Sequence, residues 1–370
     1  MRRPAEQQGG VGSGQATVRE RFFRSMAGTP SGPPIFAVYD WFVKNRPIDW
    51  ERLFQRGLGQ IAHAPLLRAE YPNAQIIESL SSDEGGERRD VRWVTDIGEL
   101  HEFYRGEWRQ EYLVKSPADY RILAHALENT HFTLDDSAFD RCEQEVGANG
   151  VTMGQLCEQT LESRSSLQAI QIDCAGLERF ALDLGSEEPA LMELIEQMDE
   201  RTIEKFQLVR SSRATMIKLW ENLSVETIGP VVYRRFLVPL YRHIFEVLSE
   251  TGQGLHVHYD GKLRSIAAEI AELPFSGLDS LTGPPEGDID AQEARQLWPD
   301  KYLWIHPNLA WYCLAEPRLQ EMFARTVRSA GNRFCLMVSE EIPVDWQRTV
   351  PLVLETLASL DSREDTGGAS

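Results

Sequence analysis

Two histidines and an aspartate alternate with apolar residues in segment 255–260, which reads Leu-His-Val-His-Tyr-Asp. Because the side chains of a β-strand alternate between its two faces, His256, His258 and Asp260 are predicted to share one face. Gly261 is expected to end the strand, with a helix directly after it. Imidazole and carboxylate groups at the C-terminal tip of a strand can bind a divalent metal or transfer protons. His258 and Asp260 are therefore the candidate catalytic residues.

His256 lies one pleat deeper along the same strand, so we expect it to be buried and structural, with hydrogen bonds to neighbouring strands. The whole segment also has a purely structural interpretation, in which a buried histidine is bonded within the core and Asp260 caps the following helix. The alternation of two imidazoles and a carboxylate on one face favours function over this alternative.

The size and charge of the chain limit its classes of function. Its 370 residues, 42% of them hydrophobic, can bury a large core. The formal net charge of −19 argues against binding to nucleic acid or to an anionic membrane surface. No apolar run reaches the roughly 18–20 residues that span a bilayer, and the N-terminus lacks a secretory signal pattern. The 5 cysteines include no C-x-x-C pair, which favours a reduced, cytoplasmic protein without a disulfide framework.

Short apolar runs alternate with amphipathic segments over most of the chain, as expected of repeated βα units. The eight runs predicted as strands are 34–39, 74–80, 151–156, 215–221, 255–259, 277–281, 302–306 and 333–338. Eight parallel strands in one chain predict an α/β fold of the (β/α)8 TIM barrel type. We expect a single domain over residues 17–360, between polar tails at 1–16 and 361–370. A polar turn at 81–89 between two apolar stretches predicts a β-hairpin insertion after strand two.

In a barrel of this kind the active site lies at the C-terminal ends of the strands. Several polar or aromatic residues are predicted there and are candidates for binding a small-molecule substrate: Asp40, Trp41, Glu221, Asn222, His306 and Asn308. Asparagine also serves as a turn residue, so Asn222 and Asn308 have a structural alternative. Glu340 and Glu341 follow the last predicted strand and are further candidates.

Several segments resemble the uroporphyrinogen decarboxylase superfamily, which includes the methylcobamide:coenzyme M methyltransferases. The resemblance spans roughly residues 18–357. It rests on segment 19–28 (RERFFRSMAG), segment 33–36 (PPIF), Ile228-Gly229-Pro230 with Tyr233 and segment 236–239 (FLVP), His258-x-Asp260-Gly261, and Glu340-Glu341-Ile342-Pro343. Members of this family are (β/α)8 barrels, which agrees with the predicted strand count.

The chain departs from both branches of the family. The decarboxylases have an R-Q-A-G-R motif after the first strand, where segment 37–42 here reads AVYDWF. An acidic residue at that place does not suit a tetrapyrrole with many carboxylates. The methyltransferases bind zinc through H-x-C after strand five and a cysteine after strand eight. The corresponding positions here are His258, Asp260 and Glu340, or Glu341 if the alignment shifts by one residue. Cys335 does not replace the missing thiolate, because it falls inside the strand.

The resemblance therefore implies a metal site with harder ligands than the family's own. Such a set suits Zn²⁺ first, with Mn²⁺ or Fe²⁺ as competitors. Three functions remain open. The first is metal-assisted methyl transfer with a methylcorrinoid as co-substrate and a corrinoid protein as partner. The second is a metal-free decarboxylase or lyase reaction on a small carboxylate or a tetrapyrrole. In this reaction His258 donates a proton and Asp260 orients the His258 ring. The third is a non-catalytic barrel that accompanies a corrinoid protein.

Overall fold

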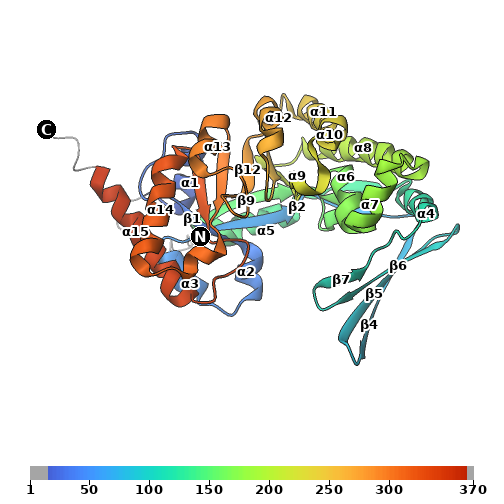
Figure 1. Ribbon diagram of the computed structural model, residues 1–370, viewed down its shortest axis with the longest axis horizontal. Helices are drawn as coiled ribbons and strands as arrows, with labels where there is room; N and C mark the ends of the chain where they lie inside the picture. Colours follow the sequence, from blue (N-terminus) through green and yellow to red (C-terminus); the bar gives the residue numbers. More distant parts are fainter. Residues whose placement is uncertain (1–15, 365–370) are drawn as a thin grey trace, which may run out of the picture.

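A closed barrel of eight parallel strands forms the centre of the computed structural model, which describes residues 16–364 (Figure 1). The strands follow the order β1-β14-β13-β12-β11-β10-β9-β2 around the barrel. They are β1 (Phe36–Tyr39), β2 (Gly59–Pro65), β9 (Gly150–Gln155), β10 (Met216–Leu219), β11 (Gly254–His258), β12 (Gly277–Thr282), β13 (Tyr302–His306) and β14 (Phe334–Met337). The predicted (β/α)8 TIM barrel is confirmed.

Helices connect successive strands and cover the outside of the barrel. The longer ones are α1 (Val18–Met26), α5 (Ser137–Val146), α7 (Gly176–Gly185), α8 (Pro189–Val209), α11 (Val238–Leu248), α14 (Glu316–Ala330) and α15 (Trp346–Glu364). The shorter ones include α2 (Asp40–Asn45), α3 (Trp50–Gln55), α9 (Val225–Ile228), α10 (Pro230–Val232), α12 (Ala267–Glu272) and α13 (Ala291–Leu297). Within the described part of the chain, no helix combines the length and the apolar character that crossing a membrane requires.

The ends of the chain differ slightly from the predicted boundaries. Thr17 caps α1, where its side chain accepts a hydrogen bond from the amide of Glu20 and the Glu20 carboxylate accepts one from the amide of Thr17. The expected N-terminal tail lies almost entirely outside the described residues. At the other end α15 continues to Glu364, so the predicted tail from 361 begins too early.

The prediction of the second barrel strand was wrong. Segment 74–80 belongs to β4 (Gln75–Asp83), which pairs with β5 (Gly86–Val94) and not with the barrel. The true second strand is β2, which pairs with β1 and β9. Its sequence, GQIAHAP, has small residues and a proline, whereas β4, QIIESLSSD, begins with two adjacent isoleucines of high strand propensity.

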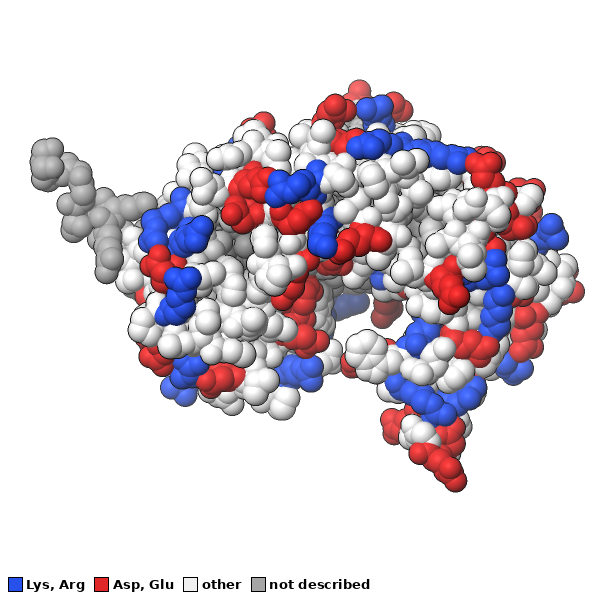
Figure 2. Space-filling view, viewed as in Figure 1, with Lys and Arg blue, Asp and Glu red and all other residues white. Residues whose placement is uncertain are grey.

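The predicted hairpin insertion is confirmed and is larger than expected. Between β2 and β9 the chain forms a four-stranded antiparallel sheet of β4, β5, β6 (Glu99–Arg105) and β7 (Trp108–Glu111). A two-stranded sheet of β3 (Leu67–Glu70) and β8 (His131–Leu134) and helix α4 (Pro117–Leu127) complete it. The four-stranded sheet projects away from the barrel (Figure 1), and Figure 2 shows a hollow between the two. The arrow of β2 points toward this side, so the C-terminal ends of the barrel strands face the hollow.

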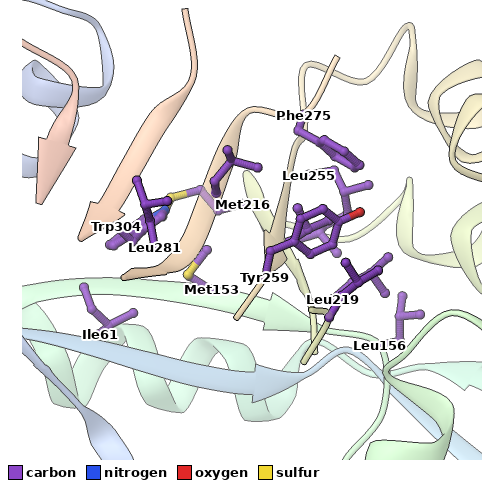
Figure 3. Packing of buried hydrophobic residues seen from close by; sticks show 14 of the residues in the cluster. Ile61, Met153, Leu156, Met216, Leu219, Leu255, Tyr259, Phe275, Leu281 and Trp304 are labelled. Carbon is purple, nitrogen blue, oxygen red and sulfur yellow. The ribbon is translucent and has the colours of Figure 1, made fainter. Parts of the chain in front are cut away.

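The lower interior of the barrel is packed with apolar side chains. Figure 3 shows Met153, Met216 and Trp304 pointing toward one another from three strands, and all three are buried. His256 joins this layer and accepts a hydrogen bond at Nδ1 from Nε1 of Trp304, at 3.1 Å. The prediction that His256 is buried and structural is confirmed, but its hydrogen bond comes from β13, two strands away, and not from a neighbouring strand. Burial lowers the pKa of His256 to about 4, so this imidazole is neutral.

Candidate active site

Above this apolar layer, β11 places His258 at the C-terminal end of the barrel. His258 is buried, and its Nδ1 donates a hydrogen bond to Oδ2 of Asp279 at 2.6 Å. Its other nitrogen, Nε2, lies 3.2 Å from Oδ1 of Asp260. The side chain of Asp260 is 34% exposed, so the pair lies between the barrel interior and the mouth.

Glu340 comes to the same place from the end of β14. One carboxylate oxygen, Oε1, accepts a hydrogen bond from the hydroxyl of Ser280 and lies 2.7 Å from Nδ1 of His306. One potential ligand atom from each of His258, Asp260 and Glu340 lies within 4.8 Å of the other two. The predicted convergence of these three residues is confirmed.

The structure also decides between the two adjacent glutamates. The side chain of Glu341 is 62% exposed and lies 3.7 Å from Nη2 of Arg46. Glu341 therefore points away from the cluster, and Glu340 is the residue that could complete a ligand set.

Asp279 is the centre of the buried network and was not predicted. Its Oδ2 lies 2.5 Å from Nζ of Lys218 as well as accepting the bond from His258, and its Oδ1 accepts a hydrogen bond from the Tyr39 hydroxyl at 2.7 Å. Nε2 of His306 lies 3.0 Å from the same hydroxyl. Since the tyrosine proton is already donated to Asp279, His306 donates here.

An irregularity in β12 positions this carboxylate and its neighbour. The pairing of β12 with β13 shifts register between Leu278 and Leu281, and Ser280 has a φ of 64°. A non-glycine residue in the left-handed region is unfavourable and is common beside functional sites. The result is that Asp279 contacts Lys218 while the next residue, Ser280, contacts Glu340.

A second buried acid–base pair lies on the far side of Lys218. Nδ1 of His63 donates to Oδ1 of Asp40 at 3.0 Å, and Nζ of Lys218 donates to Nε2 of His63 at 3.4 Å. Nζ of Lys44 donates to the other oxygen of Asp40 at 2.5 Å. Acidic and basic groups thus alternate across the barrel interior from α2 to β11, so each buried charge has a partner.

The electrostatics follow from this alternation. Burial lowers the pKa of His258, but the carboxylates of Asp260 and Asp279 more than offset it and raise this pKa to about 10. Burial and the nearby Lys218 ammonium lower the pKa of His63 to about 4. Burial raises the pKa of Asp279, and Lys218 and His258 outweigh it, so the pKa falls well below its usual value. At neutral pH these pKa values correspond to an imidazolium at His258 and a neutral imidazole at His63.

The other predicted substrate residues divide into two groups. Asp40 and His306 belong to the buried network around Asp279, Asp40 through His63 and Lys218 and His306 through Tyr39 and Glu340. Trp41 lies beside this network and stacks on Tyr39, with ring centroids 4.1 Å apart. Glu221 is buried on the other side of its strand, where it accepts hydrogen bonds from the amide and hydroxyl of Ser165. It therefore holds a connecting segment and does not face the cluster.

The two asparagines also lie outside the cluster. Asn222 adopts a φ of 44° and accepts a hydrogen bond from Nη1 of Arg164 at 2.6 Å. Arg164 in turn donates to the carboxylate of Asp173 at 2.8 Å. The carbonyl of the preceding residue, Ile172, accepts a hydrogen bond from Arg109 of β7. Asn222 is thus a turn residue within the contacts that fasten the inserted sheet. Asn308 is buried and donates to the carbonyl of Gly283 at 3.2 Å.

The residues present fit a divalent metal. Adjacent donor atoms around an ion at bond lengths of about 2.0–2.2 Å lie roughly 3 Å or slightly more apart, and His258 Nε2 and Asp260 Oδ1 are separated by 3.2 Å. Metal-binding histidines usually donate their other ring N–H to a carboxylate, which is what His258 does with Asp279. One nitrogen and two carboxylates suit Zn²⁺, Mn²⁺ or Fe²⁺.

A cavity of about 690 Å³ lies at the opposite end of the barrel. Its lining includes Pro33 and Pro34, which precede β1, and Asn332 and Phe334 at the start of β14. These are the N-terminal ends of the strands, so this cavity is separate from the charged cluster and has none of its chemistry.

Comparisons with known proteins identify no family. No family model matches the chain, and no curated protein matches it. Among solved structures, a xylose isomerase domain protein from Planctomyces limnophilus is 11% identical, with 90% of this chain and 99% of that chain covered and a TM-score of 0.39. A mandelate racemase/muconate lactonizing protein from Herpetosiphon aurantiacus is 10% identical, with 76% and 90% covered and a TM-score of 0.17. Neither likeness is strong enough to bear on activity, and the (β/α)8 barrel is established by the strand order of the chain itself.

Proposed function

We propose that this protein is a metal-dependent methyltransferase similar to the corrinoid-linked branch of the uroporphyrinogen decarboxylase superfamily. His258, Asp260 and Glu340 would hold the metal. The observation that carries the proposal is the convergence of these three side chains from the ends of β11 and β14. A methylcorrinoid is the co-substrate that the family resemblance implies, and a corrinoid protein is the implied partner.

When bound, a divalent metal with carboxylate ligands supplies Lewis-acid polarisation of an oxygen atom. The protein's own groups then have distinct tasks. Asp279 fixes the orientation of the His258 ring by accepting a hydrogen bond from its Nδ1–H, which leaves Nε2 for the metal. Ser280 and His306 hold the carboxylate of Glu340 in place. Lys218 balances the charge of Asp279 without reaching solvent, since its side chain is fully buried.

Metal content distinguishes the ligands from their neighbours. Purified wild-type protein, dialysed and reloaded with Zn²⁺, Mn²⁺ or Fe²⁺, should retain about one metal per chain by mass spectrometry. Glu340→Ala should reduce this retention, whereas the matched variant Glu341→Ala should not, because Glu341 is exposed and contacts Arg46. In a methylcobalamin assay, the protein that retains less metal should also cause a smaller loss of the methylcobalamin absorbance. Equal retention by both variants would contradict the ligand assignment.

A metal-free decarboxylase or lyase is the second candidate, and one observation favours it. His258 is a buried imidazolium between two carboxylates, which suits a general acid that protonates a carbanion. Asp260 would then orient His258 and bind no metal. This reaction would not respond to chelators, which separates it from the first candidate.

A further inference from the structure

Two partly exposed indoles form a corner beside the charged cluster. Trp41 is the second residue of α2, just after β1, and Trp220 follows β10, so they come from different sides of the barrel mouth. Their ring centroids are 5.5 Å apart and their planes are inclined at 56°. Trp298 and Trp304, by contrast, are fully buried and serve as core residues.

Aromatic and polar groups fix the inner side of each indole. Trp41 stacks on Tyr39, and the ring of His63 lies 5.6 Å from Trp41 and 4.7 Å from Trp220. Nε1 of Trp220 donates to Oε1 of Gln155 at 2.9 Å. Both rings therefore have packing partners on their inner side, which favours a preorganised binding wall.

The corner adjoins the proposed metal ligands. The ring centroids of Trp220 and His258 are 5.4 Å apart, and His258 lies 3.2 Å from Asp260. A ligand that packs against the indoles therefore lies close to both residues. The indoles provide apolar faces, while the side chains of Asp260 and Glu340 are the exposed polar groups of the cluster, at 34% and 43%.

We propose that Trp41 and Trp220 form a subsite for a planar, neutral aromatic ring of the substrate, whose oxygen substituent faces Asp260 and Glu340. This inference rests on the proposed function, because it assigns the substrate oxygen to the metal. Aromatic rings stack on indoles in offset or tilted arrangements. Nζ of Lys218 lies 3.6 Å from the ring centroid of Trp220, so a cation of the protein itself already makes the cation–π contact with this indole.

Phenol and cyclohexanol test the subsite as matched probes, because both carry one hydroxyl on a six-membered ring and only phenol is planar and aromatic. In ligand-observed NMR titrations of the full chain, phenol should bind about three- to tenfold more tightly than cyclohexanol, the range expected for one aromatic stacking contact. Trp41→Leu should remove this preference, and Trp41→Phe should restore part of it. Trp108→Leu is the control, since Trp108 is 79% exposed on β7 and makes no ring contact with the corner.

Metal retention is measured on the same samples, so the two proposals fail differently. Trp41→Leu should keep its metal while losing the preference for phenol. Equal affinity of the wild type for both probes would overturn the subsite even if the metal is bound. An equal loss in Trp108→Leu would also overturn it, because binding would then depend on an exposed indole outside the corner. If the wild type retains no metal but still binds phenol more tightly than cyclohexanol, the result would contradict the metal proposal and leave the aromatic subsite standing.

Discussion

The carboxylate of Asp279 accepts a hydrogen bond from Nδ1 of His258 at 2.6 Å, and both residues are buried. The pairing of β11 with β12 places them directly side by side. This contact determines which nitrogen of His258 faces the mouth. The chemistry proposed for His258 therefore depends on the buried carboxylate of Asp279.

Asp279→Asn should weaken metal binding by about 10- to 100-fold, the usual effect of removing a carboxylate that supports a metal-binding histidine. The amide can no longer favour the tautomer with the proton on Nδ1. Competition with a chelator of known affinity measures the loss. The exposed variant Asp345→Asn, at 56% side-chain exposure, serves as the control. Unchanged affinity in Asp279→Asn would show that the contact does not position His258.

Lys218→Met should destabilise the fold by about 3–5 kcal/mol, because it leaves Asp279 without its buried cationic partner. Combining Lys218→Met with Asp279→Asn should cost less than the sum of the two single changes. Denaturant unfolding of the three variants gives this comparison. Lys262→Met removes an exposed pair with Glu226 and should change stability by less than about 1 kcal/mol. Additive losses would mean that the two buried residues do not interact.

Asp260 separates the two candidate functions. If it binds a metal, Asp260→Ala should abolish activity and lower metal content, and Asp260→Cys should partly restore zinc binding, because zinc accepts carboxylate or thiolate. If it only orients His258, Asp260→Asn should remain slowly active and insensitive to chelators. Metal stoichiometry and residual rates of these variants, with and without chelator, distinguish the outcomes.

Glu221 should make stability depend on pH. Burial raises its pKa to about 7 from an ordinary value of 4.5, against the opposing effect of Ser165. The folded protein thus holds this proton more tightly than the unfolded chain, so its contribution to stability is full below pH 4.5 and is lost as the pH rises through 7. The loss is on the order of 3 kcal/mol. Glu221→Gln should flatten the dependence of unfolding free energy on pH between 4.5 and 7, whereas Glu341→Gln should not. Identical profiles for wild type and Glu221→Gln would contradict this account.

The barrel could be predicted from the sequence because seven of its strands are short apolar runs, each followed by a helix. The second strand could not, since β2 consists mainly of small residues and the inserted β4 has the stronger strand pattern. No local pattern shows that the segment 67–134, from β3 to β8, leaves the barrel before the chain returns through α5 to β9, because this depends on which strands pair over long sequence distances.

The candidate site, like the barrel, could be predicted only in part from the sequence. His258, Asp260 and Glu340 were predicted because they lie at or just after the ends of strands, where the fold concentrates its polar groups. Asp279, Lys218 and His63 were missed because each lies inside a buried strand. A signal existed: Lys218 interrupts the apolar run of β10, and a buried lysine requires a partner. The period of two would also have placed Glu221 on the opposite side from Lys218 and Trp220.

The most direct test of the metal proposal is anomalous scattering from crystals of the full chain soaked in Zn²⁺ or Mn²⁺, with data collected on both sides of the metal's absorption edge. The account predicts one strong peak about 2.0–2.3 Å from Nε2 of His258 and from carboxylate oxygens of Asp260 and Glu340. No peak at this position, together with full methyl-transfer or decarboxylase activity after exhaustive chelation, would contradict it.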